Sequence, residues 1–133
     1  MFASPAGRHT GGMRIFIVED SEPVLERVTA LLGAIPGVSV AGSAGTVREA
    51  IDGILATRPE VVVLDLSLGN ESGFEVLRAV HGRAPAIDFY MLSNFASEPY
   101  RRHAEQLGAR GFFDKTTEFE RVRKLVAARA APH

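Results

Sequence analysis

Short, almost uninterrupted apolar runs recur along the chain and alternate with segments in which apolar residues return every three or four positions. A continuous run of Val, Ile and Phe is typical of a strand buried on both faces, and the three-to-four spacing is typical of an amphipathic helix. The apolar runs occupy residues 15–18, 38–41, 61–64, 87–92 and 111–113. They predict five strands, each followed by a helix.

The helical segments carry apolar stripes of unequal strength. The stripe of residues 21–34 includes Leu31, and the stripe of the last segment includes Leu125, so both leucines are expected to face the core. Residues 97–107 have few apolar positions, and Tyr100 is one of them. We therefore expect the helix in this segment to be loosely anchored.

Local signals mark where helices and turns begin. A hydroxyl residue followed three positions later by Glu is a capping box, which predicts the start of a helix. Three such sequences begin at Thr46, Ser72 and Thr117. Residues 42–45, Gly-Ser-Ala-Gly, lack the full pattern of a phosphate-binding loop, so we interpret them as a turn.

The order of strands and helices predicts an α/β fold. Strand and helix alternate five times, and right-handed crossovers then give a doubly wound parallel sheet with helices on both faces. A (βα)8 barrel needs about 200 residues or more and is excluded by the length of 133 residues. We expect a flexible tail at residues 1–12, followed by one domain at residues 13–133.

Composition and charge exclude several classes of function. The formal net charge is -1 and the basic residues are dispersed, so direct binding of nucleic acid is not expected. The chain has no cysteine, which removes disulfides, thiolate catalysis and cysteine metal sites. No apolar run approaches the roughly 20 residues that cross a bilayer, and residues 1–12 lack a signal-peptide core. We expect a cytoplasmic protein that does not enter the membrane.

Chemically active side chains follow four of the five predicted strands. They are Glu19 and Asp20, then Asp65, then Ser93, and finally Lys115. Ligands of an open parallel sheet bind beyond the carboxyl ends of its strands, so these five side chains are expected to meet there. Carboxylates suit Mg²⁺, whereas a lysine and a hydroxyl suit the oxygens of a phosphoryl group. The pattern predicts a site for phosphoryl transfer.

Some of these residues also have plain structural interpretations. One acid at a strand end, such as Asp20 alone, is usually a helix cap or a solvated loop residue. The joint functional interpretation is favoured because four strand ends carry the required residue types in the required order. The histidines show no ligand spacing and are interpreted as surface residues; they are His9, His81, His103 and His133.

The strand-end motifs resemble those of the receiver domain of two-component response regulators, over residues 13–130. The motifs that carry this resemblance are Val18-Glu19-Asp20, Leu64-Asp65-Leu66-Ser67-Leu68, Ser72-Gly73-Phe74-Glu75-Val76-Leu77, Met91-Leu92-Ser93-Asn94 and Gly108-Ala109-Arg110-Gly111-Phe112-Phe113-Asp114-Lys115. The resemblance implies a flavodoxin-like or CheY-like (βα)5 fold with strand order 2-1-3-4-5. It also implies a phosphoprotein that relays signals, with no enzyme activity beyond its own phosphorylation and dephosphorylation.

The resemblance assigns roles to the acidic residues. Asp65 matches the phosphoacceptor, which attacks the phosphoimidazole of a histidine kinase or phosphotransfer protein. Asp20 and Asp65 match the Mg²⁺ ligands, with the backbone carbonyl of Ser67 as a third ligand and Glu19 contributing through water. Magnesium is therefore the expected cofactor.

The resemblance also assigns a switch and an output surface. Ser93 and Lys115 match the residues that contact the phosphoryl group, and Ser93 with Phe112 matches the pair that signals its presence. Phosphorylation is expected to act on the face of the fourth helix, fifth strand and fifth helix, where an unknown protein binds. That face carries Phe95, Tyr100, Arg101 and Arg102.

The chain departs from the family pattern in the turn after its lysine. The family commonly has a proline there with a cis bond, whereas this chain has Thr116, so the bond is either trans or a costly non-proline cis. Phe112 lacks a hydroxyl, so its ring cannot make a hydrogen bond as part of the switch. Neither departure removes a reacting group.

Three functions remain as alternatives at this point. The first is a single-domain response regulator whose output is protein binding, expected because the chain ends at His133 without an effector. The second is the excised receiver domain of a multidomain transcriptional regulator. The third is a small Mg²⁺-dependent aspartyl phosphatase, which is disfavoured because Ser67 stands where such enzymes place a second acid.

Overall fold

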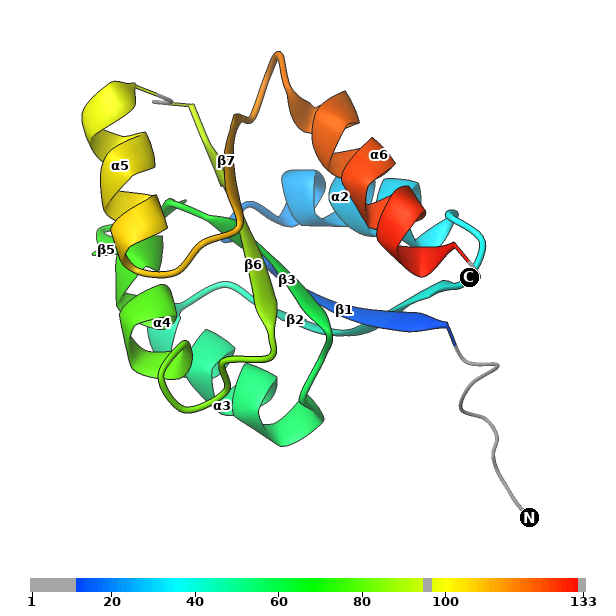
Figure 1. Ribbon diagram of the computed structural model, residues 1–133, viewed down its shortest axis with the longest axis horizontal. Helices are drawn as coiled ribbons and strands as arrows, with labels where there is room; N and C mark the ends of the chain where they lie inside the picture. Colours follow the sequence, from blue (N-terminus) through cyan, green and yellow to red (C-terminus); the bar gives the residue numbers. More distant parts are fainter. Residues whose placement is uncertain (1–11, 95–96, 132–133) are drawn as a thin grey trace.

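A five-stranded parallel sheet lies between two layers of helices in the computed structural model, which describes residues 12–94 and 97–131 (Figure 1). In chain order the strands and helices are β1 Met13–Val18, α2 Glu22–Gly33, β2 Val38–Ala44, α3 Val47–Thr57, β3 Val61–Asp65, β4 Ser67–Leu68, β5 Glu71–Ser72, α4 Gly73–Val80, β6 Asp88–Ser93, α5 Glu98–Gln106, β7 Gly111–Asp114 and α6 Phe119–Ala130. The strand order is β2-β1-β3-β6-β7, with β4 and β5 forming a separate hairpin. Without that hairpin, the order is the expected 2-1-3-4-5.

The period-two alternation of side chains divides the core between the two faces of the sheet. Phe16 and Val18 of β1 belong to the core under α3, α4 and α5, whereas Ile15 and Ile17 belong to the core under α2 and α6. Figure 1 shows α2 and α6 together on one side of the sheet and the other three helices on the opposite side. Both faces are therefore covered, which is why the strands consist of continuous apolar runs.

Two of the three predicted helix starts are confirmed. The Thr46 hydroxyl accepts a hydrogen bond from the amide of Glu49 at 3.2 Å, as a capping box requires. Ser72 also caps its helix, but its hydroxyl accepts from the amide of Phe74, at 3.1 Å. The start predicted at Thr117 is wrong, because α6 begins at Phe119. The amide of Thr117 is instead bound by the carboxylate that precedes it in the turn after β7.

The helical stripes are narrower than the sequence pattern predicts. Leu31 is 42% exposed, Leu125 is 41% exposed and Tyr100 is 44% exposed, so the expectation that both leucines face the core is wrong. Each helix contacts the sheet through buried neighbours of these leucines instead. They are Val28 and Leu32 in α2, and Val122 and Val126 in α6. Leu31 instead borders a hollow between α2 and the loop after β7.

The turn expected at residues 42–45 is also corrected, because β2 extends to Ala44. The ladder between β1 and β2 shifts its register by one residue after Ile15 and then continues through the pair Phe16 and Gly42. A Cβ atom on Gly42 would lie 3.0 Å from the Phe16 ring. Glycine therefore leaves the space in which this ring packs, and the strand continues where the sequence indicates a turn.

Two of the histidines expected at the surface, His81 and His103, are partly buried. His81 is half-buried against Gly108, and its Nδ1 atom is buried without a hydrogen-bond partner among the described residues. His103 is half-buried and stands edge-on to the Phe74 ring, with the ring centres 4.6 Å apart. His9, His133 and residues 1–11 of the expected tail lie outside the described residues. No helix in the described part of the chain is long and apolar enough to span a membrane.

Candidate functional site

The carboxyl ends of β1, β3 and β7 bring a lysine between two buried acids. Asp65 is the last residue of β3 and is 5% exposed, and Glu19 directly follows β1 and is 4% exposed. The Nζ atom of Lys115, the first residue after β7, lies 2.7 Å from Oε1 of Glu19 and 2.8 Å from Oδ2 of Asp65. Residues far apart in the sequence thus meet at one edge of the sheet, as the strand-end pattern predicts.

A third acid completes a cluster suited to a divalent cation. Glu19, Asp20 and Asp65 each offer a carboxylate oxygen, and these oxygens lie within 4.8 Å of one another. Backbone amides orient all three groups: Ser21 donates to Glu19 at 3.0 Å, Gly69 donates to Asp20 at 2.8 Å, and Ser67 donates to Asp65 at 3.3 Å. Converging hard oxygen atoms are the ligands that Mg²⁺ prefers, so the donor set fits this ion.

The charges in this cluster affect one another's ionisation. Burial raises the pKa of Glu19, and the negative charge of Asp65 adds to this effect, while hydrogen bonds from Lys115 and Ser21 oppose it. Burial by itself lowers the pKa of Lys115, but its hydrogen bonds to Asp65 and Glu19 outweigh burial, so its pKa is raised. The ammonium therefore stays charged and offsets part of the repulsion among the carboxylates.

The predicted switch residues lie on the two neighbouring strands. Ser93 is the last residue of β6 and is 1% exposed, and its carbonyl accepts a hydrogen bond from the Lys115 amide at 2.8 Å. Phe112 of β7 is 7% exposed and belongs to the core beneath α5. Ser67, in contrast, is exposed in the short β4 strand. Phe95 lies outside the described residues.

Comparison with known proteins agrees with this geometry. The family model of the response regulator receiver domain matches residues 15–127. The chain belongs to this family. A transcriptional activator of Mycobacterium tuberculosis, described as DNA-binding and called DevR/DosR, is 36% identical over 103 residues, which are 77% of this chain and 48% of that protein. This receiver domain thus spans about half of that relative.

Other relatives carry receiver domains in different settings. A protein-glutamate methylesterase/protein-glutamine glutaminase of Nocardioides is 29% identical over 74% of this chain, but the match covers 27% of that protein. The structure of a two-component response regulator of the LuxR family from Aurantimonas has a TM-score of 0.79 and 26% identity, over 91% of this chain and 89% of that one. The Thermotoga maritima CheB response regulator domain, at 20% identity and TM-score 0.78, shares the fold.

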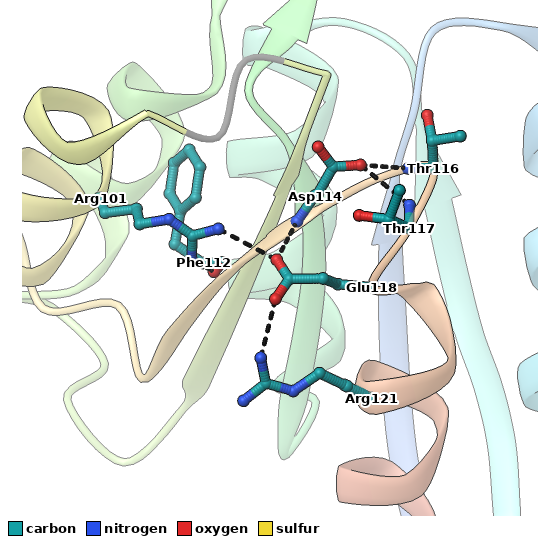
Figure 2. Close-up of polar contacts among 7 residues, drawn as sticks. All are labelled: Arg101, Phe112, Asp114, Thr116, Thr117, Glu118 and Arg121. Carbon is teal, nitrogen blue, oxygen red and sulfur yellow. Dashed lines mark hydrogen bonds and ion pairs between the residues drawn. The ribbon is translucent and has the colours of Figure 1, made fainter.

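The turn that carries Lys115 is held by two carboxylates (Figure 2). Oδ1 of Asp114 accepts hydrogen bonds from the amides of Thr116 at 2.8 Å and Thr117 at 2.9 Å. Oε1 of Glu118, at the end of the turn, accepts from the amide of Asp114 at 2.8 Å. The described residues contain no cis peptide bond, so the bond between Lys115 and Thr116 is trans. Thr116 also supplies an amide donor that a proline would lack.

Arg101 of α5 joins this turn to the neighbouring helix, as Figure 2 shows. Its guanidinium donates to the carbonyl of Phe112 at 2.5 Å and to Oε1 of Glu118 at 3.0 Å, and it lies 5.7 Å from the centre of the Phe112 ring. Arg121 of α6 donates to the other oxygen of Glu118 at 2.7 Å. Arg101 therefore binds β7 and the start of α6 at the same time.

Sequence reasoning missed part of this arrangement. Arg101 is expected from the sequence to lie on an output face, but its contacts with Phe112 and Glu118 depend on how α5 packs beside β7. Glu118 lies within the capping box predicted at Thr117. That local signal assigns Glu118 to the start of a helix and gives no indication that its carboxylate binds Arg101 and the Asp114 amide. The one signal in the sequence that could have indicated this contact is an arginine, Arg101, in a helical segment with few apolar residues to hold it against the core.

The hydrogen bonds of Asp114 predict how stability depends on pH. The amides of Thr117 and Thr116 lower the pKa of Asp114 from its usual value of 3.8. A carboxylate with a lowered folded pKa adds stability above its unfolded pKa, and this stability is lost as pH falls through the folded pKa. We expect urea unfolding midpoints to fall as the pH drops below 3.8, and to fall less in Asp114→Asn.

The exposed Asp52, which pairs with Arg48 on α3, offers the matched control for this measurement. Asp52→Asn should keep the wild-type dependence on pH, because its carboxylate pairs with one exposed arginine on the same helix and binds no turn amide. An Asp114→Asn protein with the same slope as wild type would show that the turn does not depend on an ionised Asp114.

Proposed function

We propose that this receiver domain is a phosphoryl-accepting switch of a two-component system, with Asp65 as the acceptor. The observation that carries the proposal is the position of Lys115, whose ammonium contacts Asp65 at 2.8 Å and Glu19 at 2.7 Å. A buried acid beside a fixed cation and two further carboxylates suits a nucleophile that must receive an anionic group. Membership of the receiver family supports the same function.

The chemistry follows from the arrangement around Asp65. A carboxylate oxygen of Asp65 forms a bond to the phosphorus of a phosphorylated histidine. The bond between phosphorus and the imidazole nitrogen breaks, and the nitrogen keeps the electron pair. Lys115 and the hydroxyl of Ser93 are the proposed groups that stabilise the charge on the phosphoryl oxygens. Hydrolysis of the resulting acyl phosphate returns the switch to its starting state.

Magnesium is the proposed cofactor, held by Asp20 and Asp65, with the carbonyl of Ser67 as a further ligand and Glu19 acting through water. When bound, it supplies positive charge that neutralises the incoming phosphoryl group. The residues themselves have separate tasks: Asp20 is held by the Gly69 amide at 2.8 Å, and Glu19 also binds Lys115. This division predicts unequal effects of replacing the two acids.

Replacing Asp20 should weaken magnesium binding more than replacing Glu19. We expect Asp20→Asn to lower the affinity for Mg²⁺ by about tenfold or more, because Asp20 is a proposed direct ligand. Glu19→Gln should lower the affinity less, because Glu19 is proposed to reach the ion through a water molecule. Calorimetric titration with Mg²⁺ measures both, with Asp52→Asn on the exposed face of α3 as the control. Unchanged affinity in Asp20→Asn would contradict this assignment of ligands.

Two surfaces are proposed for protein partners. A hollow of about 340 Å³ lies between α2 and the loop after β7, and because Lys115 lines it, it opens beside the proposed acceptor site. Its lining is mixed: five residues are apolar, and the other four are Arg27, Asn94, Lys115 and Thr116. The exposed Leu31 borders this hollow, which suits docking of a histidine kinase or phosphotransfer protein. The face of α5, β7 and α6 is the proposed output surface, and its exposed Tyr100 and Arg102 are available to a downstream protein.

The test is phosphorylation by a small donor. Incubation of the protein with acetyl phosphate and Mg²⁺ should add one phosphoryl group, seen in the intact mass. Reduction of the acyl phosphate with borohydride followed by peptide mapping should locate it at Asp65. A phosphoryl group on another residue, or none under conditions in which the fold is intact, would contradict the proposal.

The relatives support a second form of output for the same switch. Two of them are described as a DNA-binding transcriptional activator and a transcriptional regulatory protein. In this form the receiver domain is part of a longer regulator, and phosphorylation controls an attached DNA-binding domain. A DNA-binding domain encoded in frame with this sequence in the native gene supports that form, and its absence supports a separate protein-binding switch.

A further inference from the structure

The turn between β7 and α6 determines where the backbone of Lys115 lies. Its two ends are joined by the hydrogen bond from the Asp114 amide to Oε1 of Glu118, 2.8 Å long. Between these ends, the Lys115 amide is bound to the Ser93 carbonyl, and its side chain extends to Asp65. A change in the path of residues 114–118 therefore moves the point from which the ammonium reaches the acceptor.

Glu118 is the residue on which this turn and its surroundings converge. Its carboxylate accepts from the Asp114 amide, from Arg101 and from Arg121, so it binds β7, α5 and α6 together. These hydrogen bonds lower the pKa of Glu118, so the carboxylate is held in its charged form. The Glu118 side chain is 21% exposed, which leaves these contacts partly shielded from water.

We propose that Glu118 is a positioning residue for Lys115, and that Arg101 links it to α5, so that the placement of α5 sets the rate at which Asp65 accepts a phosphoryl group. The inference rests on the proposed function of Asp65. Arg101 holds the Phe112 carbonyl and Glu118 with one rigid guanidinium. A displacement of α5 therefore acts on the chain both before and after Lys115. A protein that binds α5 would change acceptance at Asp65 through this link.

The two lysines of the chain make the position of Lys115 directly measurable. Lys115 and Lys124 are its only lysines, so selective ¹³Cε labelling gives two signals, assigned with Lys124→Arg. Lys124 is exposed on α6 and serves as an internal reference. At one fixed pH without phosphodonor, Glu118→Gln should shift the Lys115 signal and leave the Lys124 signal in place.

Phosphorylation gives the second measurement. With acetyl phosphate and Mg²⁺, Glu118→Gln should lower the rate of acceptance by about three- to tenfold, because small misplacements of a charge-stabilising group are costly. Arg101→Gln should shift the Lys115 signal in the same direction and slow acceptance. The effects of the two substitutions on the rate of acceptance should be less than additive in the double variant, because both substitutions remove the contact between Arg101 and Glu118.

Glu120→Gln is the matched control. Glu120 lies in the first turn of α6, two residues after Glu118, and pairs with Arg123 three positions later, as Glu118 pairs with Arg121. No described contact joins the Glu120 side chain to α5 or to the turn. Equal Lys115 signals and equal rates in Glu118→Gln and Glu120→Gln, with both proteins folded by circular dichroism, would overturn the inference. A wild-type protein that accepts no phosphoryl group would contradict the function of Asp65, while the lysine signals still decide the positioning role.

Discussion

Asp65→Asn is expected to abolish phosphoryl acceptance while the fold stays intact. The amide oxygen of asparagine is not a nucleophile at neutral pH, so no acyl phosphate can form. The substitution keeps the size of the side chain and an oxygen that can accept from the Ser67 amide, and Lys115 keeps its contact with Glu19 at 2.7 Å. The loss of reaction should therefore not be accompanied by unfolding.

Intact mass after incubation with acetyl phosphate and Mg²⁺ measures this loss, and thermal unfolding measures the fold. Asp88→Asn provides the control, because Asp88 is a partly buried acid at the opposite end of β6 that pairs with Arg110 and Arg129. The control should accept one phosphoryl group like the wild type. Phosphorylation of Asp65→Asn to a similar extent would show that the acceptor is another residue.

Gly73→Ala is expected to lower the free energy of unfolding by about 2–4 kcal/mol, which is in the upper range for a single substitution. A Cβ atom at Gly73 would lie 2.2 Å from the backbone oxygen of Asp65, well inside contact distance. The Gly73 amide also donates to the Leu66 carbonyl at 2.6 Å, so this backbone cannot move away without losing that bond. The strain would fall on the backbone of Asp65, the proposed acceptor.

Urea unfolding of Gly73→Ala and of a second glycine variant, Gly82→Ala, tests this expectation. Gly82→Ala is the matched control, because a Cβ atom there meets nothing within 4 Å. It should change the free energy of unfolding by no more than about 1 kcal/mol. Equal stability of Gly73→Ala and the control would show that the loop after β3 relaxes freely.

The sequence predicts the sheet and the site because both depend on short-range patterns repeated at strand ends. Buried strands with chemically active residues at their carboxyl ends are enough to bring Glu19, Asp65 and Lys115 together once the sheet is parallel. The contact between Arg101 and Glu118 depends on how α5 packs beside β7, and no local pattern in the sequence specifies that packing. This is why the link from Arg101 to Glu118 is absent from the sequence-based prediction.

The same reasoning explains the wrong predictions at single residues. A capping box at Thr117 is a valid local signal, but the Asp114 carboxylate binds the Thr117 amide first and delays the helix to Phe119. The exposure of Leu31 likewise reflects competition, because neighbouring Val28 and Leu32 already fill the contact with the sheet. Tertiary contacts decide between local alternatives that are similar in energy.

The contact between Lys115 and Asp65 spans 50 positions of the chain and joins strands near its middle and its end. Such long-range contacts carry a large cost of loop closure, so they tend to form late in folding. During synthesis, β1 and β3 leave the ribosome before β7, and until β7 docks beside β6 the acids at their ends lack their lysine. The proposed acceptor site is therefore complete only when β7 is in place, because β7 leads into the lysine that contacts both buried acids.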